Sequence, residues 1–406
     1  MIRHGVKRVR TTAEQLALKK KREAIKITEY RGLVDRVNAS RAQGCYNLAA
    51  LDLTTQLLTW NPEYYTIWNY RREIFTEGLF PTLPDLSSSD LATKLDSVQA
   101  VLDADLHFIE ARLKQSPKCY WIWNHRKWCL GRSPQPNWAR EMKLVGMILE
   151  YDERNYHGWE YRRYVVRQHE AALIKALDSQ SELDAMVKID QIKSNLLRTE
   201  FAYTTKKINK NFSNFSAWHN RAKLMPQLLS NQTSIALSRK KQDEQVTVDP
   251  RFSLVHDPLA FLRAEIEFIR QAIFTDPDDQ SAWLYHRWLI TSPRAICSGP
   301  AANLPGALPL LPLGSTLMTH DEEIDMVKCE IESIGELYDY EPDSKWCIYG
   351  LIFFNVYLVK TLEGQRAVDF TAEFQEDIRS KLHKLIELDP LRAGQYRDWE
   401  SSIFSN

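Results

Sequence analysis

The side chains best placed for chemistry in this 406-residue sequence are cations that recur beside aromatic residues. The fullest example is SPKCYWIWNHRKW, residues 116–128, in which Trp123 is followed three residues later by Arg126. A guanidinium group can lie over an indole ring or reach a carboxylate on a neighbouring helix. Packing is our first interpretation of both residue types, because Trp is highly buried on average.

Metal and thiol chemistry are not indicated by the Cys residues. They are scattered, with no C-x-x-C pair and no His at ligand spacing, so we expect neither a zinc site nor a disulfide framework in this chain. This usage is typical of a reduced, cytoplasmic protein. The 53 Lys and Arg residues balance 53 Asp and Glu residues, which argues against nucleic acid as a partner. The six Cys residues are Cys45, Cys119, Cys129, Cys297, Cys329 and Cys347.

The Trp–Arg unit occurs five times. A turn former before Pro, as in Asn61-Pro62 and Ser116-Pro117, predicts that a helix starts there. The aromatic residue three positions before the Trp is predicted to share its helix face. Arg follows the Trp by three residues in four units, whereas Arg287 of the fifth unit comes one residue late. The Trp residues are Trp68, Trp123, Trp159, Trp218 and Trp283, and the preceding aromatic residues are Tyr65, Tyr120, Tyr156 and Phe215.

The spacing of these units predicts the fold class. Trp123 and Trp159 are 36 residues apart, and the longer intervals fit the same period with insertions. A period in the mid-thirties is typical of helical hairpins that bury a face only against their neighbours. We therefore expect an all-α protein, a right-handed α-α superhelix or solenoid with the shape of a crescent.

Along the chain, residues 1–27 form a basic tail that includes the start of the first helix, for which Thr11 or Thr12 is the predicted cap. Residues 28–406 are predicted to form the repeat domain. Within it, long helices are expected at 91–115 and 321–338, and the Pro-rich stretch 292–316 is predicted to be a disordered insertion. The apolar run 346–359 is too short to span a bilayer and predicts a buried helix.

The Pro-x-x-Tyr-x-x-Trp-x-x-Arg unit resembles the repeat of protein prenyltransferase α subunits, and the resemblance covers nearly the whole chain. Three passages favour the Rab geranylgeranyltransferase branch of that family: HGVKRVRTTAEQ, DERNYHGWEYRR and TDPDDQSAWLYHRWL. The resemblance implies an obligate heterodimer with a β subunit, which holds the zinc ion and the lipid pocket. It also implies transfer of geranylgeranyl from geranylgeranyl diphosphate to C-terminal cysteines of Rab GTPases, which a Rab escort protein presents.

The same resemblance implies which residues of this chain face the active site. Lys118 and Tyr120 in SPKCYW and His157 in RNYHGW match the family's active-site positions. Trp121 stands where the farnesyl enzyme has a polar residue that meets the substrate's C-terminal carboxylate, so we expect that contact to be absent. His4 is a possible ligand to the zinc ion of the β subunit. Read without the family, Lys118 is an exposed turn lysine, Tyr120 is a core aromatic residue and His157 is a satisfied turn histidine.

Two other functions stay open at this stage. One is the α subunit that the farnesyl and type I geranylgeranyl enzymes share. The other is a non-catalytic helical-repeat scaffold of tetratricopeptide type, although that consensus is missing here.

Overall fold

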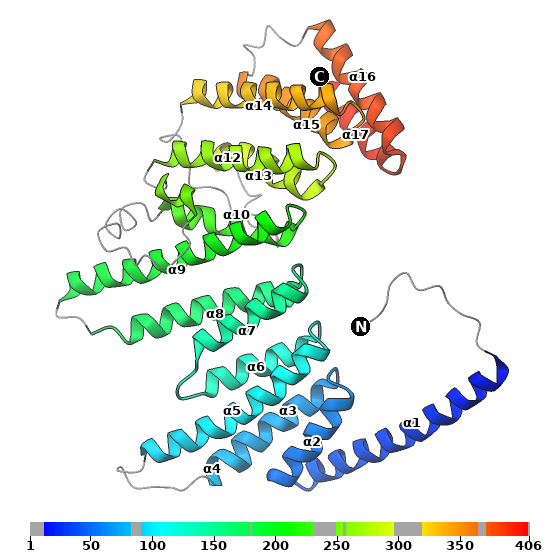
Figure 1. Cartoon of the computed structure of the whole chain (residues 1–406), viewed down its shortest axis with the longest axis vertical. Coiled ribbons are helices and arrows are strands. Elements are labelled where there is room, and N and C mark those ends of the chain that lie inside the picture. The colour runs from blue at the N-terminus through cyan, green and yellow to red at the C-terminus, as the bar shows by residue number, and fades with distance from the viewer. Residues whose placement is uncertain are drawn as a thin grey trace. The chain divides into compact units, whose positions relative to one another are not determined.

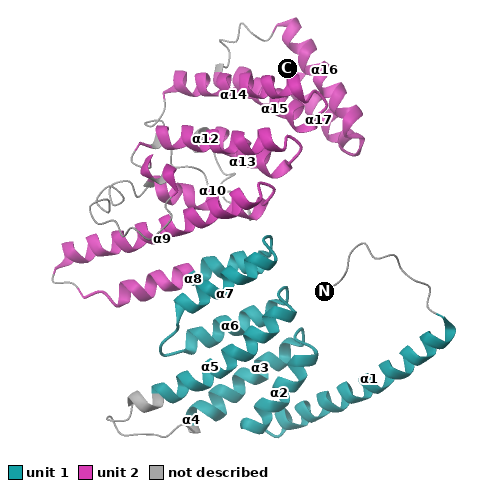
Figure 2. Ribbon diagram, viewed as in Figure 1, with its two compact units in different colours: residues 1–165 teal, residues 166–406 magenta. Residues whose placement is uncertain are grey.

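The computed structural model of the chain describes residues 12–82, 91–178, 181–230, 249–254, 257–295, 319–363 and 371–404. Every regular element in these ranges is a helix (Figure 1). The chain divides into two compact units, residues 1–165 and 166–406 (Figure 2). The prediction of an all-α protein is therefore confirmed for the described part of the chain.

The helices of the first unit follow one another as antiparallel pairs after a long leading helix. A π-helix, Ile74–Leu79, follows α3, and α8 continues into the second unit. The bounds are α1 (Ala13–Ala42), α2 (Leu48–Trp60), α3 (Tyr65–Glu73), α4 (Phe80–Thr82), α5 (Leu91–Gln115), α6 (Tyr120–Arg132), α7 (Trp138–Tyr151) and α8 (Tyr156–Lys175).

The second unit contains three more hairpins and a C-terminal helix pair. Short 3-10 helices cover Pro250–Leu254 and Pro390–Arg392, and a π-helix covers Leu358–Glu363. The α-helices are α9 (Glu182–Lys210), α10 (Phe215–Ser230), α12 (Pro258–Thr275), α13 (Gln280–Ala295), α14 (His320–Tyr340), α15 (Lys345–Tyr357), α16 (Ala372–Leu388) and α17 (Ala393–Phe404). Repeated helical hairpins, as predicted from the Trp spacing, are confirmed.

The repeated Trp residues tie each hairpin turn to its second helix. Every one is buried, and its indole Nε1 donates a hydrogen bond to the backbone carbonyl six residues earlier, at 2.7 to 2.9 Å. The pairs are Trp68 with Pro62, Trp123 with Pro117, Trp159 with Glu153, Trp218 with Phe212 and Trp283 with Pro277. The Trp therefore fills the core and also satisfies a turn carbonyl that no helix would pair.

The predicted helix starts at Pro62, Pro117 and Pro277 are wrong. Asn61 is the C-cap of α2, and α3 begins only at Tyr65, three residues after Pro62. The second Trp–Arg unit, residues 116–128, is built in the same way, since α6 begins at Tyr120 after its N-cap Cys119. The turn former and Pro end one helix of the hairpin and leave room for the carbonyl that accepts the indole hydrogen bond.

The two aromatic residues of each pair lie three residues apart on one helix, but they differ in their exposure to solvent. The first aromatic residue of each pair opens the second helix at the tip of its hairpin, where it is exposed while the Trp is buried. The exposed fractions are 51% for Tyr65, 59% for Tyr120, 66% for Tyr156 and 43% for Phe215. The hairpin tips therefore carry large aromatic side chains on the surface.

Most predicted helix boundaries agree with the structure. Thr12 caps α1 through a reciprocal capping box with Gln15, and α5 covers 91–115 as expected. The predicted insertion starts too early, because α13 continues through Ala295 before the described chain stops. The remainder of the insertion lies outside the described residues.

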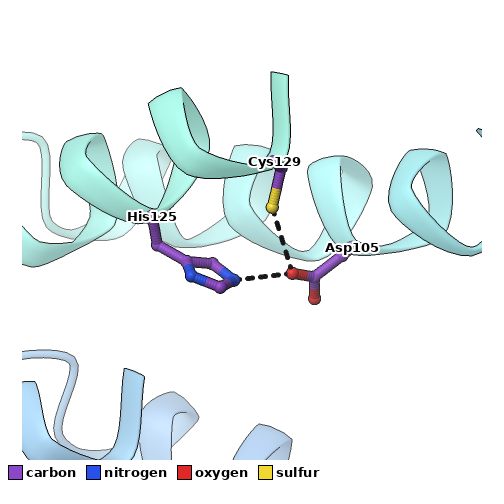
Figure 3. Close-up of side chains that lie close together, drawn as sticks. All are labelled: Asp105, His125 and Cys129. Atoms are coloured by element: carbon purple, nitrogen blue, oxygen red, sulfur yellow. Dashed lines mark hydrogen bonds and ion pairs between the residues drawn. The ribbon is translucent and has the colours of Figure 1, made fainter. Parts of the chain in front are cut away.

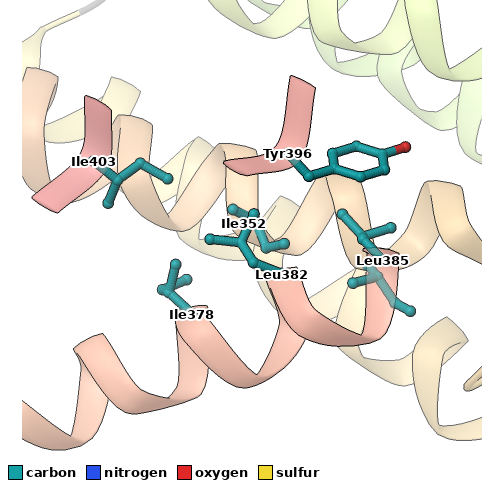
Figure 4. Packing of buried hydrophobic residues seen from close by; sticks show 7 residues of the cluster. Ile352, Ile378, Leu382, Leu385, Tyr396 and Ile403 are labelled. Carbon is teal, nitrogen blue, oxygen red and sulfur yellow. The ribbon is translucent and has the colours of Figure 1, made fainter. Parts of the chain in front are cut away.

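The C-terminal pair α16 and α17 packs on α15 around a hydrophobic cluster (Figure 4). The members of this cluster are Ile348, Ile352, Ile378, Leu382, Leu385, Tyr396 and Ile403. The run 346–359 supplies two of them and is buried along most of its length, which confirms a buried helix. In the part of the chain that the structure describes, no helix combines the length and the apolarity that crossing a bilayer demands.

Replacing Trp218 by Phe is expected to lower the free energy of unfolding by about 1 to 3 kcal/mol, because the carbonyl of Phe212 then loses its buried donor. Trp60→Phe is the matched control, since Trp60 is half exposed. Urea unfolding followed by far-UV circular dichroism compares the two variants. Equal midpoints for both variants would contradict a structural role for the indole hydrogen bond.

Candidate functional site

The Arg residues that follow the repeated Trp are buried and hold neighbouring hairpins together. Arg126 lies on α6, and its Nε and Nη2 donate to the carboxylate of Glu141 on α7 at 2.7 and 2.6 Å. Its Nη1 donates to the carbonyl of Leu106 on α5, so one guanidinium links α6 to both α5 and α7. Arg71 makes the equivalent pair with Asp105, and Arg221 makes it with Glu265. The prediction that these residues pack and pair is confirmed for Arg71, Arg126 and Arg221.

Each of these buried carboxylates also accepts a hydrogen bond from its own hairpin, from a side chain 20 residues later. Tyr161 OH donates to Glu141 at 2.5 Å, and Tyr285 OH donates to Glu265 at 2.9 Å. His125 Nε2 lies 2.7 Å from Asp105. Burial alone would raise the pKa of Asp105, but Arg71 and the His125 hydrogen bond hold that pKa well below its usual range. Asp105 therefore stays ionised, and each of the three carboxylates links two consecutive hairpins.

In the fifth Trp–Arg unit, which contains Trp283, His286 takes the place of the repeated Arg. It lies three residues after Trp283, is buried, and its Nε2 is 2.7 Å from Glu330 on α14. Arg287, which the spacing marked as the late Arg, donates instead to the hydroxyl of Tyr349 at 2.9 Å. The residue three positions after the Trp is therefore the one that pairs with a buried carboxylate, and the sequence alone identifies it as His286.

One group of side chains in the described residues has donor atoms close enough to hold a metal ion: Asp105, His125 and Cys129 (Figure 3). Arg71 already binds the carboxylate, and Arg72 Nε donates to His125 Nδ1 at 3.2 Å. Burial raises the pKa of the Cys129 thiol well above its ordinary value, whereas a zinc ligand must be a thiolate. The group is a hydrogen-bonded structural network and does not fit a zinc centre.

The structure brings together the three residues that the family resemblance selected. Tyr120 opens α6 and His157 lies in the first turn of α8, and their ring centroids are 4.1 Å apart in an edge-to-face arrangement. The His157 ring also lies next to the backbone of Lys118. Burial lowers the pKa of His157, so the ring is neutral at physiological pH. A core position for Tyr120 is wrong, because it is exposed at the hairpin tip.

Lys118 extends into solvent at the turn between α5 and α6. Its side chain is 76% exposed, and its Nζ lies 3.3 Å from Oδ2 of Asp152, in the next hairpin turn. The neighbouring Trp121 ring packs on Tyr65 of the preceding hairpin, with 5.1 Å between ring centroids. This placement is compatible with both interpretations of Lys118, an exposed turn lysine and an active-site cation.

His4, the possible zinc ligand, lies outside the described residues. Cys119, next to Lys118, is no nucleophile, because burial raises the pKa of its thiol to about 11 and the thiol faces the carbonyl of Pro62. The exposed group of Lys118, Tyr120 and His157 therefore offers a cation, a phenol and a neutral imidazole. Such a set can stabilise negative charge that develops on a bound ligand.

Comparison with known proteins matches five segments of the chain to the protein prenyltransferase alpha subunit repeat. The matched segments are residues 48–77, 102–133, 138–169, 197–228 and 262–293. They contain the five Trp units identified from the sequence. The repeat assignment thus agrees with the hairpins of the structure.

Relatives extend the similarity to nearly the full length. The geranylgeranyl transferase type-2 subunit alpha of Schizosaccharomyces pombe is 38% identical over 403 residues, which cover 98% of each chain. The Saccharomyces cerevisiae protein of the same name is 33% identical over 401 residues, or 97% of each chain. Candida albicans protein geranylgeranyltransferase-I, solved with GGPP, has a chain of similar fold, with a TM-score of 0.54 at 16% identity, covering 93% of this chain and 91% of that one.

Proposed function

This chain belongs to the family of geranylgeranyl transferase type-2 alpha subunits, and we propose that it works as one half of a Rab geranylgeranyltransferase, active only with a β subunit. The proposed reaction transfers geranylgeranyl from geranylgeranyl diphosphate to C-terminal cysteines of Rab GTPases, which a Rab escort protein presents. The proposed site of action is the cytoplasm. The observation that carries the proposal beyond family membership is the exposed group of Lys118, Tyr120 and His157.

The chemistry of the proposed reaction divides between the two subunits. A thiolate attacks the first carbon of the prenyl group, the carbon–sulfur bond forms, and the carbon–oxygen bond to diphosphate breaks. Zinc bound by the β subunit would supply the thiolate. Among the described residues, the cluster of Asp105, His125 and Cys129 is already paired with Arg71 and Arg72, which supports the proposal that the β subunit holds the metal.

The residues of this chain act on the leaving group. Negative charge builds on the diphosphate as the carbon–oxygen bond breaks, and a cation placed there stabilises the transition state more than the ground state. The Lys118 ammonium provides that cation, and the Tyr120 hydroxyl can donate a hydrogen bond. The neutral His157 ring packs edge-to-face against the Tyr120 ring and lies next to the Lys118 backbone. All three are exposed or half-buried, so a partner surface is needed to enclose the diphosphate.

Reconstitution tests this function. The chain alone is expected to transfer no prenyl group and to bind no stoichiometric zinc, whereas the purified complex with a type-2 β subunit prenylates a Rab protein in the presence of its escort protein. Metal analysis and transfer of labelled geranylgeranyl measure the two properties. Complexes with β subunits of the farnesyl and type I enzymes are the controls. Prenylation of a CaaX protein by one of those complexes, and none of Rab by the type-2 pair, would contradict the proposal.

A further inference from the structure

The turn that carries Lys118 is held by the hairpin turn that follows it in space. Asn155 Nδ2 donates to the carbonyl of Pro117 at 3.3 Å, and the His157 ring lies next to the Lys118 backbone. The third contact is the ion pair between Lys118 Nζ and Asp152 Oδ2. The backbone carbonyl before Lys118 and the Lys118 side chain are thus both bound from the turn between α7 and α8.

The two carboxylate oxygens of Asp152 have different partners: Oδ1 binds within its own turn, and Oδ2 pairs with Lys118. Oδ1 accepts a hydrogen bond from the backbone N–H of Arg154 at 3.2 Å, an interaction that closes the turn after α7. The same contact recurs in other hairpins, where Asn61 Oδ1 accepts from Glu63 and Asn211 Oδ1 accepts from Ser213. Asn supplies that acceptor as well as Asp does, so the turn itself does not require a carboxylate. The charge of Asp152 and its second oxygen are left to Lys118.

We infer that Asp152 is a positioning residue, which holds the Lys118 ammonium at the hairpin tip beside Tyr120 and His157. This inference rests on the proposed function, because it assigns a purpose to the position of Lys118. A Lys side chain that is 76% exposed has many rotamers available in solvent. A carboxylate fixed by Arg154 restricts that choice before the diphosphate binds, and preorganised charge is more effective than charge that must be gathered during the reaction.

Replacement of Asp152 by Asn tests the inference because it retains the turn acceptor and removes only the charge. In the complex with the β subunit, we expect the single-turnover rate of prenyl transfer to fall about two- to five-fold, the range that corresponds to an exposed ion pair. Binding of the β subunit and the melting temperature are expected to stay unchanged. In a Lys118→Ala background the same substitution is expected to have no further effect on the rate.

Asp276→Asn is the matched control, since Asp276 Oδ1 accepts from Asp278 in the equivalent turn after α12. Its rate is expected to equal that of the wild type.

A two- to five-fold loss from Asp152→Asn that persists in the Lys118→Ala background would overturn the inference. A rate above that of the wild type would also overturn it, because it would mean that Asp152 competes with the diphosphate for Lys118. A slow Lys118→Ala variant beside a normal Asp152→Asn variant overturns this inference alone. A normal Lys118→Ala variant overturns the proposed role of Lys118 and the inference with it.

Discussion

Replacement of Arg221 by Met is expected to lower the free energy of unfolding by about 3 to 5 kcal/mol, the cost of leaving one charge of a buried pair without its partner. The side chains of Arg221 and Glu265 are both fully buried, and Arg221 Nη2 donates to Glu265 at 2.8 Å. Arg221 Nη1 also donates to the hydroxyls of Thr204 and Thr205 on α9. Met preserves much of the volume, so the loss of charge and hydrogen bonds dominates.

The exposed pair of Arg41 and Glu73 provides the control for this prediction. Their side chains are 42% and 36% exposed, although Arg41 Nη2 and Glu73 are only 2.7 Å apart. Arg41→Met is expected to cost no more than about 1 kcal/mol, because water and salt screen such a pair. Denaturant unfolding of the complex with the β subunit compares the two variants. Similar losses for both would show that burial of the Arg221 pair contributes nothing to its strength.

The repeated Trp and Arg residues made most of the fold predictable from the sequence. A large buried residue that recurs with a helical period marks a hairpin even when insertions change the interval, and each of the five units lies in one. The turns were misassigned because Asn61-Pro62 satisfies the rules for a helix start as well as those for a helix stop. The hydrogen bond from the Trp indole to the turn carbonyl distinguishes a helix stop from a helix start, and only a structure shows that hydrogen bond.

The partners of the Arg residues could not be predicted. Arg126 pairs with a carboxylate 15 residues away, whereas Arg221 pairs with one 44 residues away, because the insertions between hairpins differ in length. The offset within one hairpin is constant, since Glu141 and Tyr161 are separated by 20 residues and so are Glu265 and Tyr285. His125, Tyr161 and Tyr285 each follow a repeated Trp by two residues. An acidic residue 20 positions before each of them is the carboxylate to which the Arg binds, so a search at that offset would have found Asp105, Glu141 and Glu265.

The candidate site was only partly accessible from sequence. Lys118, Tyr120 and His157 were selected by resemblance, since an exposed turn lysine has no pattern of its own. Asp152 was missed, although one signal was present: it is an Asp where the turns of the first and fourth units have Asn61 and Asn211. An Asp at this position does not by itself indicate a second contact, because Asp276 stands there in the fifth Trp–Arg unit.

Lys118→Ala is expected to reduce the single-turnover rate of prenyl transfer about 10- to 100-fold, somewhat less than removal of an enclosed oxyanion donor. Loss of an interaction made chiefly in the transition state lowers kcat and kcat/KM together and leaves substrate binding nearly unchanged. Lys118→Arg keeps the charge and is expected to recover part of the rate.

The control for this prediction is Lys384→Ala, because Lys384 on α16 also pairs with a turn carboxylate, that of Asp343, at 3.1 Å. Each ion pair has one largely exposed side chain, Lys118 in the first and Asp343 in the second, so general effects of losing a surface charge are common to the two variants. Transfer to a Rab protein is measured with the β subunit saturating, so that weaker assembly cannot imitate a slower reaction. Equal rates for the two variants would place Lys118 outside the active site, and a rate loss that disappears at higher β-subunit concentration would assign it to subunit assembly.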